Sequence, residues 1–145
     1  MIDIERVDHI GIRVTDEDRA LAFYRVLGFE VVVKVEFDAV VIIKNKNEVE
    51  INLIVNGNNN SDGKNILMDV EDKYPGYTHV ALRVDSIRDT IETLKDHNIR
   101  ITQGPVTFGD GHISIFVRDP DRNVVELRGR EQDLSDIEGV TFYEP

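Results

Sequence analysis

Two histidines occupy the same position in two copies of one short sequence pattern. The first copy is HIGIRV, residues 9–14, and the second is HVALRV, residues 79–84. A later pair of segments also aligns, residues 51–53 with residues 125–127. An internal repeat of this kind predicts two similar modules, so matched positions are expected to share a role. The repeat selects four equivalent side chains: His9, Asn52, His79 and Glu126.

These four side chains have the chemistry of a metal site. Two imidazoles and one carboxylate suit a borderline divalent ion, with open positions left for water or substrate. The amide oxygen of Asn52 is expected to be a weak fourth ligand or to orient a bound water. Glu50 lies on the same predicted strand face, two residues away, and is the alternative ligand. A single histidine on a strand is more often structural, but the matched pair and the matched acid favour a metal.

Other residues with ligand-type side chains have simpler interpretations. His97 falls at a predicted helix end, where it interacts favourably with the helix dipole. Asp119 and Asp121 flank a proline between two predicted strands and indicate a turn. His112 shares a face with Ser114 and Phe116, which are expected to line a cavity, although a surface loop is favoured for His112 itself.

Each copy predicts a strand, a helix and three further strands, with the histidine on the more polar face of the first strand. The helices are expected to begin at Thr15 or Asp16 and at Asp85 or Ser86, and to end at Gly28 and Asn98. The later strands are expected at 31–36, 40–44, 50–55, 99–103, 113–117 and 124–128.

The predicted fold is therefore α+β, with two βαβββ modules paired about a pseudo-twofold axis that brings the histidines together. Residues 1–145 are expected to form a single domain. Module one covers about 6–56, a polar linker about 57–76, module two about 77–130 and a C-terminal tail about 131–145. A loop containing Gly104 and Pro105 is expected after the strand at 99–103.

Composition narrows the possible partners. The chain has 28 acidic and 17 basic side chains and a formal net charge of -11, which argues against nucleic acid or an anionic membrane. There is no cysteine, so a thiolate metal site is excluded. No apolar run approaches the roughly 20 residues of a membrane span, and the first residues do not have the form of a signal peptide. A cytoplasmic protein is expected.

The sequence resembles the vicinal oxygen chelate superfamily, which includes glyoxalase I, extradiol dioxygenases and bleomycin-binding proteins. The resemblance covers most of residues 6–130. It rests on the segments DHI at 8–10, FYRVLGF at 23–29, THVA at 78–81, and DPD at 119–121 leading to VEL at 125–127. It implies an open, cup-shaped mixed sheet around a divalent metal (Ni, Zn, Mn or Fe), frequently completed in a homodimer, with a small-molecule substrate. The family's metal positions map onto the same four side chains.

Two more positions resemble glyoxalase I in particular. Arg13 and Asn56 each lie four residues after a predicted ligand, where glyoxalase I contacts glutathione. Asn52 departs from the pattern, because glyoxalase I has a glutamate there; metal binding survives this change, but a second proton-moving carboxylate does not. Arg122 replaces the usual glycine of the turn, which is expected to concern the backbone alone.

Three functions remain open at this point. The first is a glyoxalase-like lyase or isomerase acting through an enediolate, with Glu126 as the catalytic base and Arg13, Asn56, Ser114 and Phe116 contacting substrate. The second is an Fe(II) extradiol-type dioxygenase with His112 as acid or base. The third is a metal-free protein that binds a small molecule such as a drug. A phosphonate-modifying transferase is less favoured, because no cluster of lysine and arginine is apparent near Ser114.

Overall fold

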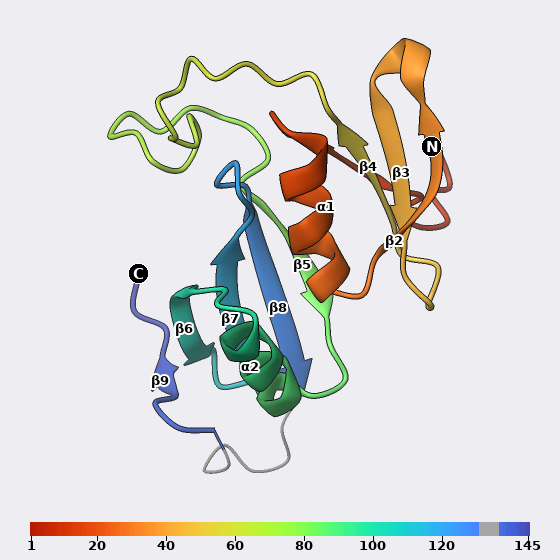
Figure 1. Cartoon of the computed structure of the whole chain (residues 1–145). Coiled ribbons are helices and arrows are strands. Elements are labelled where there is room, and N and C mark those ends of the chain that lie inside the picture. Colours follow the sequence, from red (N-terminus) through yellow and green to blue (C-terminus); the bar gives the residue numbers. More distant parts are fainter. Residues whose placement is uncertain (131–136) are drawn as a thin grey trace. The chain divides into compact units, whose positions relative to one another are not determined.

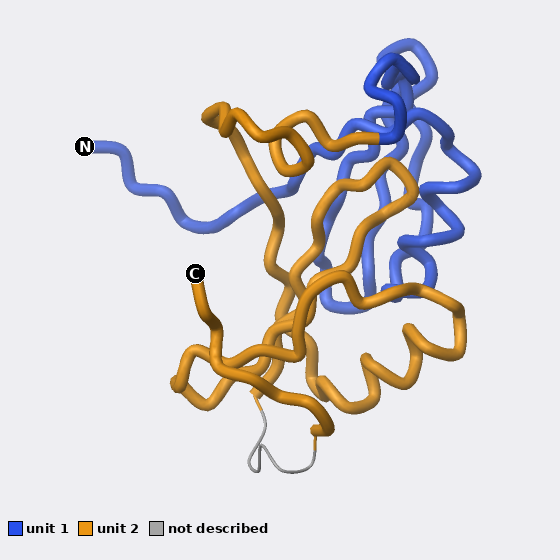
Figure 2. Tube along the Cα trace, turned by 90° about the vertical axis from the view of Figure 1, so that its left-hand side faces the viewer, with its two compact units in different colours: residues 1–63 blue, residues 64–145 orange. Residues whose placement is uncertain are grey.

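The chain forms two compact units, residues 1–63 and residues 64–145, coloured separately in Figure 2. The computed structural model describes residues 1–130 and 137–145. The boundary between the units falls inside the segment 57–76, which the sequence predicts as a linker. The first part of the predicted tail, 131–136, lies outside the described residues.

Unit 1 is a βαβββ module with a four-stranded sheet (Figure 1). Strand β1 (Ile10–Arg13) leads into helix α1 (Glu17–Val26), followed by β2 (Glu30–Val35), a short 3-10 turn η1 (Glu36–Asp38), β3 (Val40–Lys44) and β4 (Glu50–Ile54). The strand order is β1-β4-β3-β2. The first strand is parallel to β4, and the other neighbours are antiparallel.

Unit 2 repeats this topology. It contains β5 (His79–Arg83), α2 (Ile87–Asp96), β6 (Ile101–Thr107), β7 (His112–Arg118) and β8 (Val124–Arg130). A short strand near the C-terminus, β9 (Thr141–Phe142), joins the edge and gives the order β5-β8-β7-β6-β9. The predicted pair of βαβββ modules is confirmed, and the end of the tail is placed on β6.

The sheet register confirms the alignment of the two copies. Gly11 of β1 pairs with Asn52 of β4, and Ala81 of β5 pairs with Glu126 of β8. Each histidine precedes its paired small residue by two positions, so it lies on the same sheet face as the amide or the carboxylate. Each module therefore carries a histidine and a second candidate ligand on one face.

Both helices begin and end as the sequence predicts. The side chains of Asp16 and Ser86 accept hydrogen bonds from backbone N–H groups in the first turns of α1 and α2. Gly28 and Asn98 follow the helices with φ values of 94° and 57°, in the left-handed region that favours these residue types. The repeat thus extends to backbone geometry at positions where the side chains differ.

The opposite face of each sheet is the apolar one. In unit 2, Gly129 of β8 lies so close to Ile87 of α2 that an added Cβ would be 3.3 Å from the isoleucine Cβ. The helix therefore packs on the apolar face of the sheet. The histidine lies on the other, more polar face. The buried side chains on these faces and on the helices include Ile12, Leu21, Tyr24, Ile51 and Leu53 in unit 1, and Ile87, Leu94, Ile115, Val117, Val125 and Leu127 in unit 2.

Strand β6 is longer than the sequence predicts. The expected loop containing Gly104 and Pro105 instead continues the strand to Thr107, with register shifts against β7 on both sides of Gln103. Gly104 has a φ of 93°, and a Cβ at this position would lie 2.6 Å from the carbonyl oxygen of Ser114. The prediction of a loop is wrong because an irregular strand accommodates residues that usually end one.

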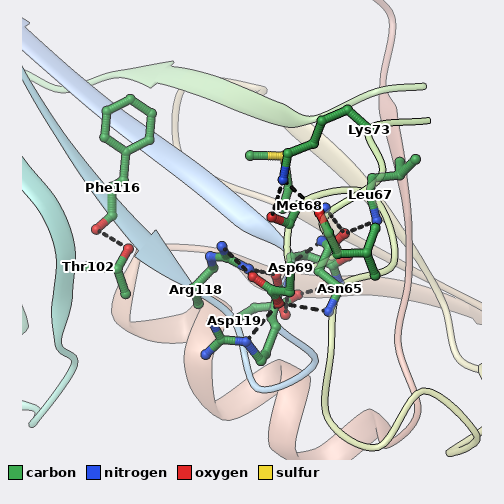
Figure 3. Close-up of polar contacts among 12 residues, drawn as sticks. Asn65, Leu67, Met68, Asp69, Lys73, Thr102, Phe116, Arg118 and Asp119 are labelled. Atoms are coloured by element: carbon green, nitrogen blue, oxygen red, sulfur yellow. Dashed lines mark hydrogen bonds and ion pairs between the residues drawn. The ribbon is translucent and has the colours of Figure 1, made fainter. Parts of the chain in front are cut away.

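The second half of the predicted linker folds onto unit 2 through Asp69 (Figure 3). Both nitrogens of the Arg118 fork donate to its carboxylate, at 3.2 and 3.0 Å, and Arg122 Nε donates at 3.0 Å. Burial alone would raise the pKa of Asp69, but the hydrogen bonds from Arg122, the Asn65 backbone and Arg118 outweigh it and hold this pKa well below its ordinary value. The side chain of Arg122 therefore has a role of its own. Its backbone also adopts the left-handed conformation, with a φ of 66°, that a glycine would adopt at this point of the turn.

Candidate metal-binding site

In unit 2, the candidate ligands His79 and Glu126 lie close together. The Nε2 atom of His79 lies 3.9 Å from a carboxylate oxygen of Glu126. Glu126 is 8% exposed, and the ring of Phe116 meets the imidazole edge to face at 5.9 Å. A buried carboxylate facing an imidazole beside an aromatic ring is a suitable environment for a bound cation and for proton transfer.

In unit 1, the candidate ligand His9 lies close to two carboxylates. Its Nδ1 lies 2.6 Å from Asp8 and 3.7 Å from Glu50. These three side chains form a group able to hold a metal ion. The pKa of Asp8 lies below its ordinary value, because the carboxylate shares a hydrogen bond with His9 and is stabilised by positive charge on the imidazole.

Asn52 has an unusual polar environment. Its Oδ1 is buried, and no hydrogen-bond partner for it occurs among the described residues. A buried acceptor without a partner typically costs about 1–3 kcal/mol, which a cation would offset. Glu50, the alternative ligand, already lies 3.7 Å from the ammonium group of Lys44. The orphaned amide oxygen and the strand register favour Asn52 as the ligand in this unit.

The two histidines share a feature that the sequence analysis missed. In each copy the side chain of the preceding residue holds Nδ1: Asp8 contacts His9 at 2.6 Å, and Thr78 Oγ1 contacts His79 at 2.8 Å. Metal-binding histidines commonly use one ring nitrogen in this way and coordinate with the other. The signal was present in the sequence, because both histidines follow a residue with a side-chain oxygen.

Arg13 and Asn56, the two positions similar to the glutathione contacts of glyoxalase I, lie together in unit 1. The guanidinium Nε of Arg13 donates to Asn56 Oδ1 at 3.1 Å. Parallel pairing of β1 with β4 continues past the strand ends through the backbone of Val14 and so brings together residues 43 positions apart.

Comparison with known proteins identifies the family. The model of the Glyoxalase/Bleomycin resistance protein/Dioxygenase superfamily matches residues 6–127. The chain belongs to this superfamily. A probable lactoylglutathione lyase of Vibrio cholerae is 32% identical over 145 residues, which cover 92% of this chain and 97% of that protein. A glyoxalase domain-containing protein of Mycosarcoma maydis is 32% identical over 130 residues, covering 87% and 69% of the two chains.

Solved structures agree with this assignment at the level of the fold. A glyoxalase/dioxygenase from Nostoc punctiforme has a TM-score of 0.67 at 18% identity and covers 88% of this chain and 92% of its own. The α+β fold class and the resemblance inferred from the sequence are confirmed. Within the described residues, no helix is long and apolar enough to cross a membrane.

The residues present fit the divalent metal that the glyoxalase superfamily typically uses. Ligand atoms about 2.0–2.2 Å from one ion lie about 3–3.5 Å apart, and the His79–Glu126 distance of 3.9 Å is close to this range. The histidine nitrogens, carboxylate and amide oxygen suit Zn, Ni, Mn or Fe. The strongest single indication is the buried Asn52 oxygen, which has no hydrogen-bond partner among the described residues.

The predicted substrate contacts Ser114 and Phe116 lie on the same face of unit 2 as Glu126. Phe116 pairs directly with Glu126 in the register. Ser114 is fully buried, and its hydroxyl accepts a hydrogen bond from Arg128 at 3.1 Å. His112 begins β7 rather than lying in a surface loop, because the strand extends one residue further than predicted.

Proposed function

We propose that this protein is a divalent-metal-dependent lyase or isomerase of the glyoxalase type. Its substrate is a small molecule with two adjacent oxygens, such as the adduct of a 2-oxoaldehyde with glutathione. Family membership supports this class, and so does 32% identity to a protein named a probable lactoylglutathione lyase. The observation that carries the proposal is Glu126, a nearly buried carboxylate that faces His79.

The proposed metal ligands are the four matched side chains His9, Asn52, His79 and Glu126. The metal would polarise a carbonyl and thereby acidify the neighbouring C–H bond. Asp8 and Thr78 hold the Nδ1 atoms of the two histidines, which leaves Nε2 of each ring as the coordinating atom. Asn52 contributes a neutral oxygen, so the site carries a single carboxylate among its matched positions.

Glu126 is the proposed general base. It removes the proton from the carbon that bears the hydroxyl and the sulfur, and returns it to the adjacent carbonyl carbon, while the hydroxyl proton passes to the former carbonyl oxygen. The hemithioacetal thereby becomes a thioester of a 2-hydroxy acid, with no external oxidant or reductant. Burial of Glu126 beside Phe116 keeps water from competing for the proton.

Arg13 and Asn56 are proposed to hold the glutathione part of the substrate. Their mutual hydrogen bond fixes the guanidinium, and an arginine fork can bind a carboxylate through two parallel hydrogen bonds. Ser114 and Phe116 remain proposed substrate contacts on unit 2. Homodimer formation and a cytoplasmic location stay predictions.

The dioxygenase alternative is less well supported by the geometry. His112, its candidate acid or base, pairs with Arg130 in the register, whereas Phe116 pairs with Glu126. Four residues along a strand correspond to about 13 Å, which separates His112 from the proposed chemistry. A metal-free binding protein would have no use for the buried Asn52 oxygen as a ligand.

The direct test is turnover of methylglyoxal with glutathione in the presence of Ni(II) or Zn(II). The proposal predicts formation of a thioester, detected by its ultraviolet absorbance, and loss of the signal after chelation. Glu92→Gln, a change on the exposed side of α2, is the matched control for Glu126→Gln and should retain activity. No thioester with either metal would overturn the proposed substrate class.

A further inference from the structure

Basic side chains gather at one end of the polar face of the unit 2 sheet. Arg83 pairs with Arg128 across β5 and β8, and Arg128 pairs with Ser114 across β8 and β7. Arg130 and His112 form the next pair on the same face. This group, Arg83, Arg128, Arg130 and His112 around Ser114, is called the basic row below. The expectation that no such cluster surrounds Ser114 is wrong, because the sheet joins arginines that lie far apart in the sequence.

Arg128, at the centre of the basic row, is held in a fixed position. One guanidinium nitrogen donates to Ser114 Oγ at 3.1 Å, and the other contacts Asp110. The guanidinium carbon lies over the ring of Phe108, 5.8 Å from its centroid, and that ring makes a tilted contact with the ring of Tyr143 at 5.0 Å between centroids. An arginine oriented in advance loses little side-chain entropy when it binds an anion.

The charge of the basic row is opposite to that of the chain. The whole protein carries a formal net charge of -11, yet this end of the sheet has three guanidinium groups, and Arg128 contacts one acid, Asp110. Burial raises the pKa of Asp110, but the His112 backbone N–H and Arg128 outweigh it, so this pKa lies below its ordinary value. Asp110 therefore stays ionised and pairs with Arg128, whereas no acidic partner of Arg83 or Arg130 occurs among the described residues.

His112 adds an unused polar atom. Its Nδ1 is buried, and no hydrogen-bond partner for it occurs among the described residues. Asp110 Oδ2 lies 3.7 Å away, beyond hydrogen-bonding distance. An unpaired buried nitrogen beside an oriented guanidinium is unfavourable unless a ligand or water satisfies it.

We propose that the basic row binds an oxyanion, a carboxylate or a phosphate, carried by a part of the substrate that Arg13 and Asn56 do not hold. Arg128 lies two residues after Glu126 on β8, on the same face, which corresponds to about 7 Å. This spacing suits a small substrate that is processed at Glu126 and held by its charged tail at Arg128. The assignment of this anion to the substrate rests on the proposed function, whereas the binding of an oxyanion does not.

The experiment measures anion binding without metal or turnover. The metal-free full-length protein is titrated with inorganic phosphate and, separately, with malonate, and backbone amide shifts are followed by NMR. We expect saturable shifts centred on residues 112–116 and 126–130 with at least one anion. The anion that binds more tightly distinguishes a phosphate tail from a carboxylate tail.

Variants assign the binding to the basic row. Arg128→Gln should weaken binding about tenfold or more, the usual effect of losing a charge-assisted hydrogen bond. Because Arg128 is packed against buried Ser114, the exposed pair Arg83→Gln and Arg130→Gln provides a second variant that is expected to fold normally. Arg100→Gln makes the same charge change at an exposed position between α2 and β6 and should leave binding unchanged.

Two results would overturn the inference: no saturable shift with either anion, or equal binding by the wild type, Arg128→Gln and the double variant. Neither result bears on thioester formation, which depends on Glu126 and the metal ligands. Conversely, anion binding at the basic row in a protein without lyase activity would retain this inference and reject the proposed function.

Discussion

Replacing Glu126 with glutamine separates metal binding from proton transfer, because an amide oxygen can coordinate a cation but cannot accept the proton. We expect Glu126→Gln to retain part of its metal while turnover falls by about 10²–10⁴-fold, the usual contribution of a general base. Metal content and steady-state turnover are measured on the same preparation. Near-normal turnover with full metal would exclude Glu126 as the base and make Glu50 the carboxylate to test.

Asp8 and Thr78 provide a second residue-level prediction. Because each holds the Nδ1 of a candidate ligand, Asp8→Asn and Thr78→Val should weaken metal binding by about 10–100-fold, as is typical for such supporting contacts. Affinity is measured by competition with a metal indicator, independently of activity. Asp3→Asn, in the exposed N-terminal segment, is the control; equal affinity in all four proteins would show that the contacts have no such role.

At the scale of residues, the repeat was sufficient to select the candidate ligands, because equivalence between copies is visible in the sequence. The burial of Asn52 Oδ1 and His112 Nδ1 without a hydrogen-bond partner among the described residues was not predictable, since burial of a single atom depends on packing. The basic row was also hidden: Arg83 and Arg128 become neighbours only when β5 pairs with β8.

The conformation of strand β6 requires Gly104 where the register shifts against β7. Gly104→Ala should destabilise the protein by more than the roughly 1–2 kcal/mol that a left-handed conformation costs, because the new Cβ would also lie 2.6 Å from Ser114 O. Gly28→Ala is a matched control, with a φ of 94° and no atom within 4 Å of its Cβ. Urea unfolding compares them; equal losses of free energy would show that the contact with Ser114 is relieved without cost.

Asp69 makes the attachment of the segment before β5 dependent on pH. Its folded-state pKa lies below the ordinary value, so its contribution to stability is present above about pH 4 and is lost as the pH falls through the folded-state pKa. Asp69→Asn should therefore lower the free energy of unfolding by about 1–3 kcal/mol at pH 7, and the difference from wild type should shrink below pH 4. Asp72→Asn, at an exposed position in the same segment, is the control. A pH-independent difference would contradict the argument.

Most elements were predictable because their signals are local. Capping residues, left-handed residues after helices and runs of β-branched side chains identified both helices and most of the strands. The segments that were not predicted are those whose structure depends on contacts with residues far away in the sequence. Gly104 and Pro105 have the local character of a loop, yet pairing with β7 holds them in a strand, and the polar segment around Asp69 is ordered by Arg118 and Arg122 from elsewhere in unit 2.

For the molecule as a whole, duplication predicted the architecture, because each copy encodes the same order of strands and the same register. The reaction was not predictable to the same degree, because members of one superfamily use similar ligands for different chemistry. The central claim is that the matched side chains of the repeat bind a divalent metal, with His9 and His79 among its ligands. His9→Ala and His79→Ala each leave too few donors to hold the ion, so each variant should lose it.

Elemental analysis of protein purified without chelator tests this claim most directly. We expect one divalent ion per chain, nickel, zinc, manganese or iron, in the wild type, and almost none in His9→Ala or His79→Ala, with Asn52→Ala less affected. A wild-type protein that contains no divalent metal and has no affinity for any of these ions would contradict it and leave a metal-free binding protein as the better account.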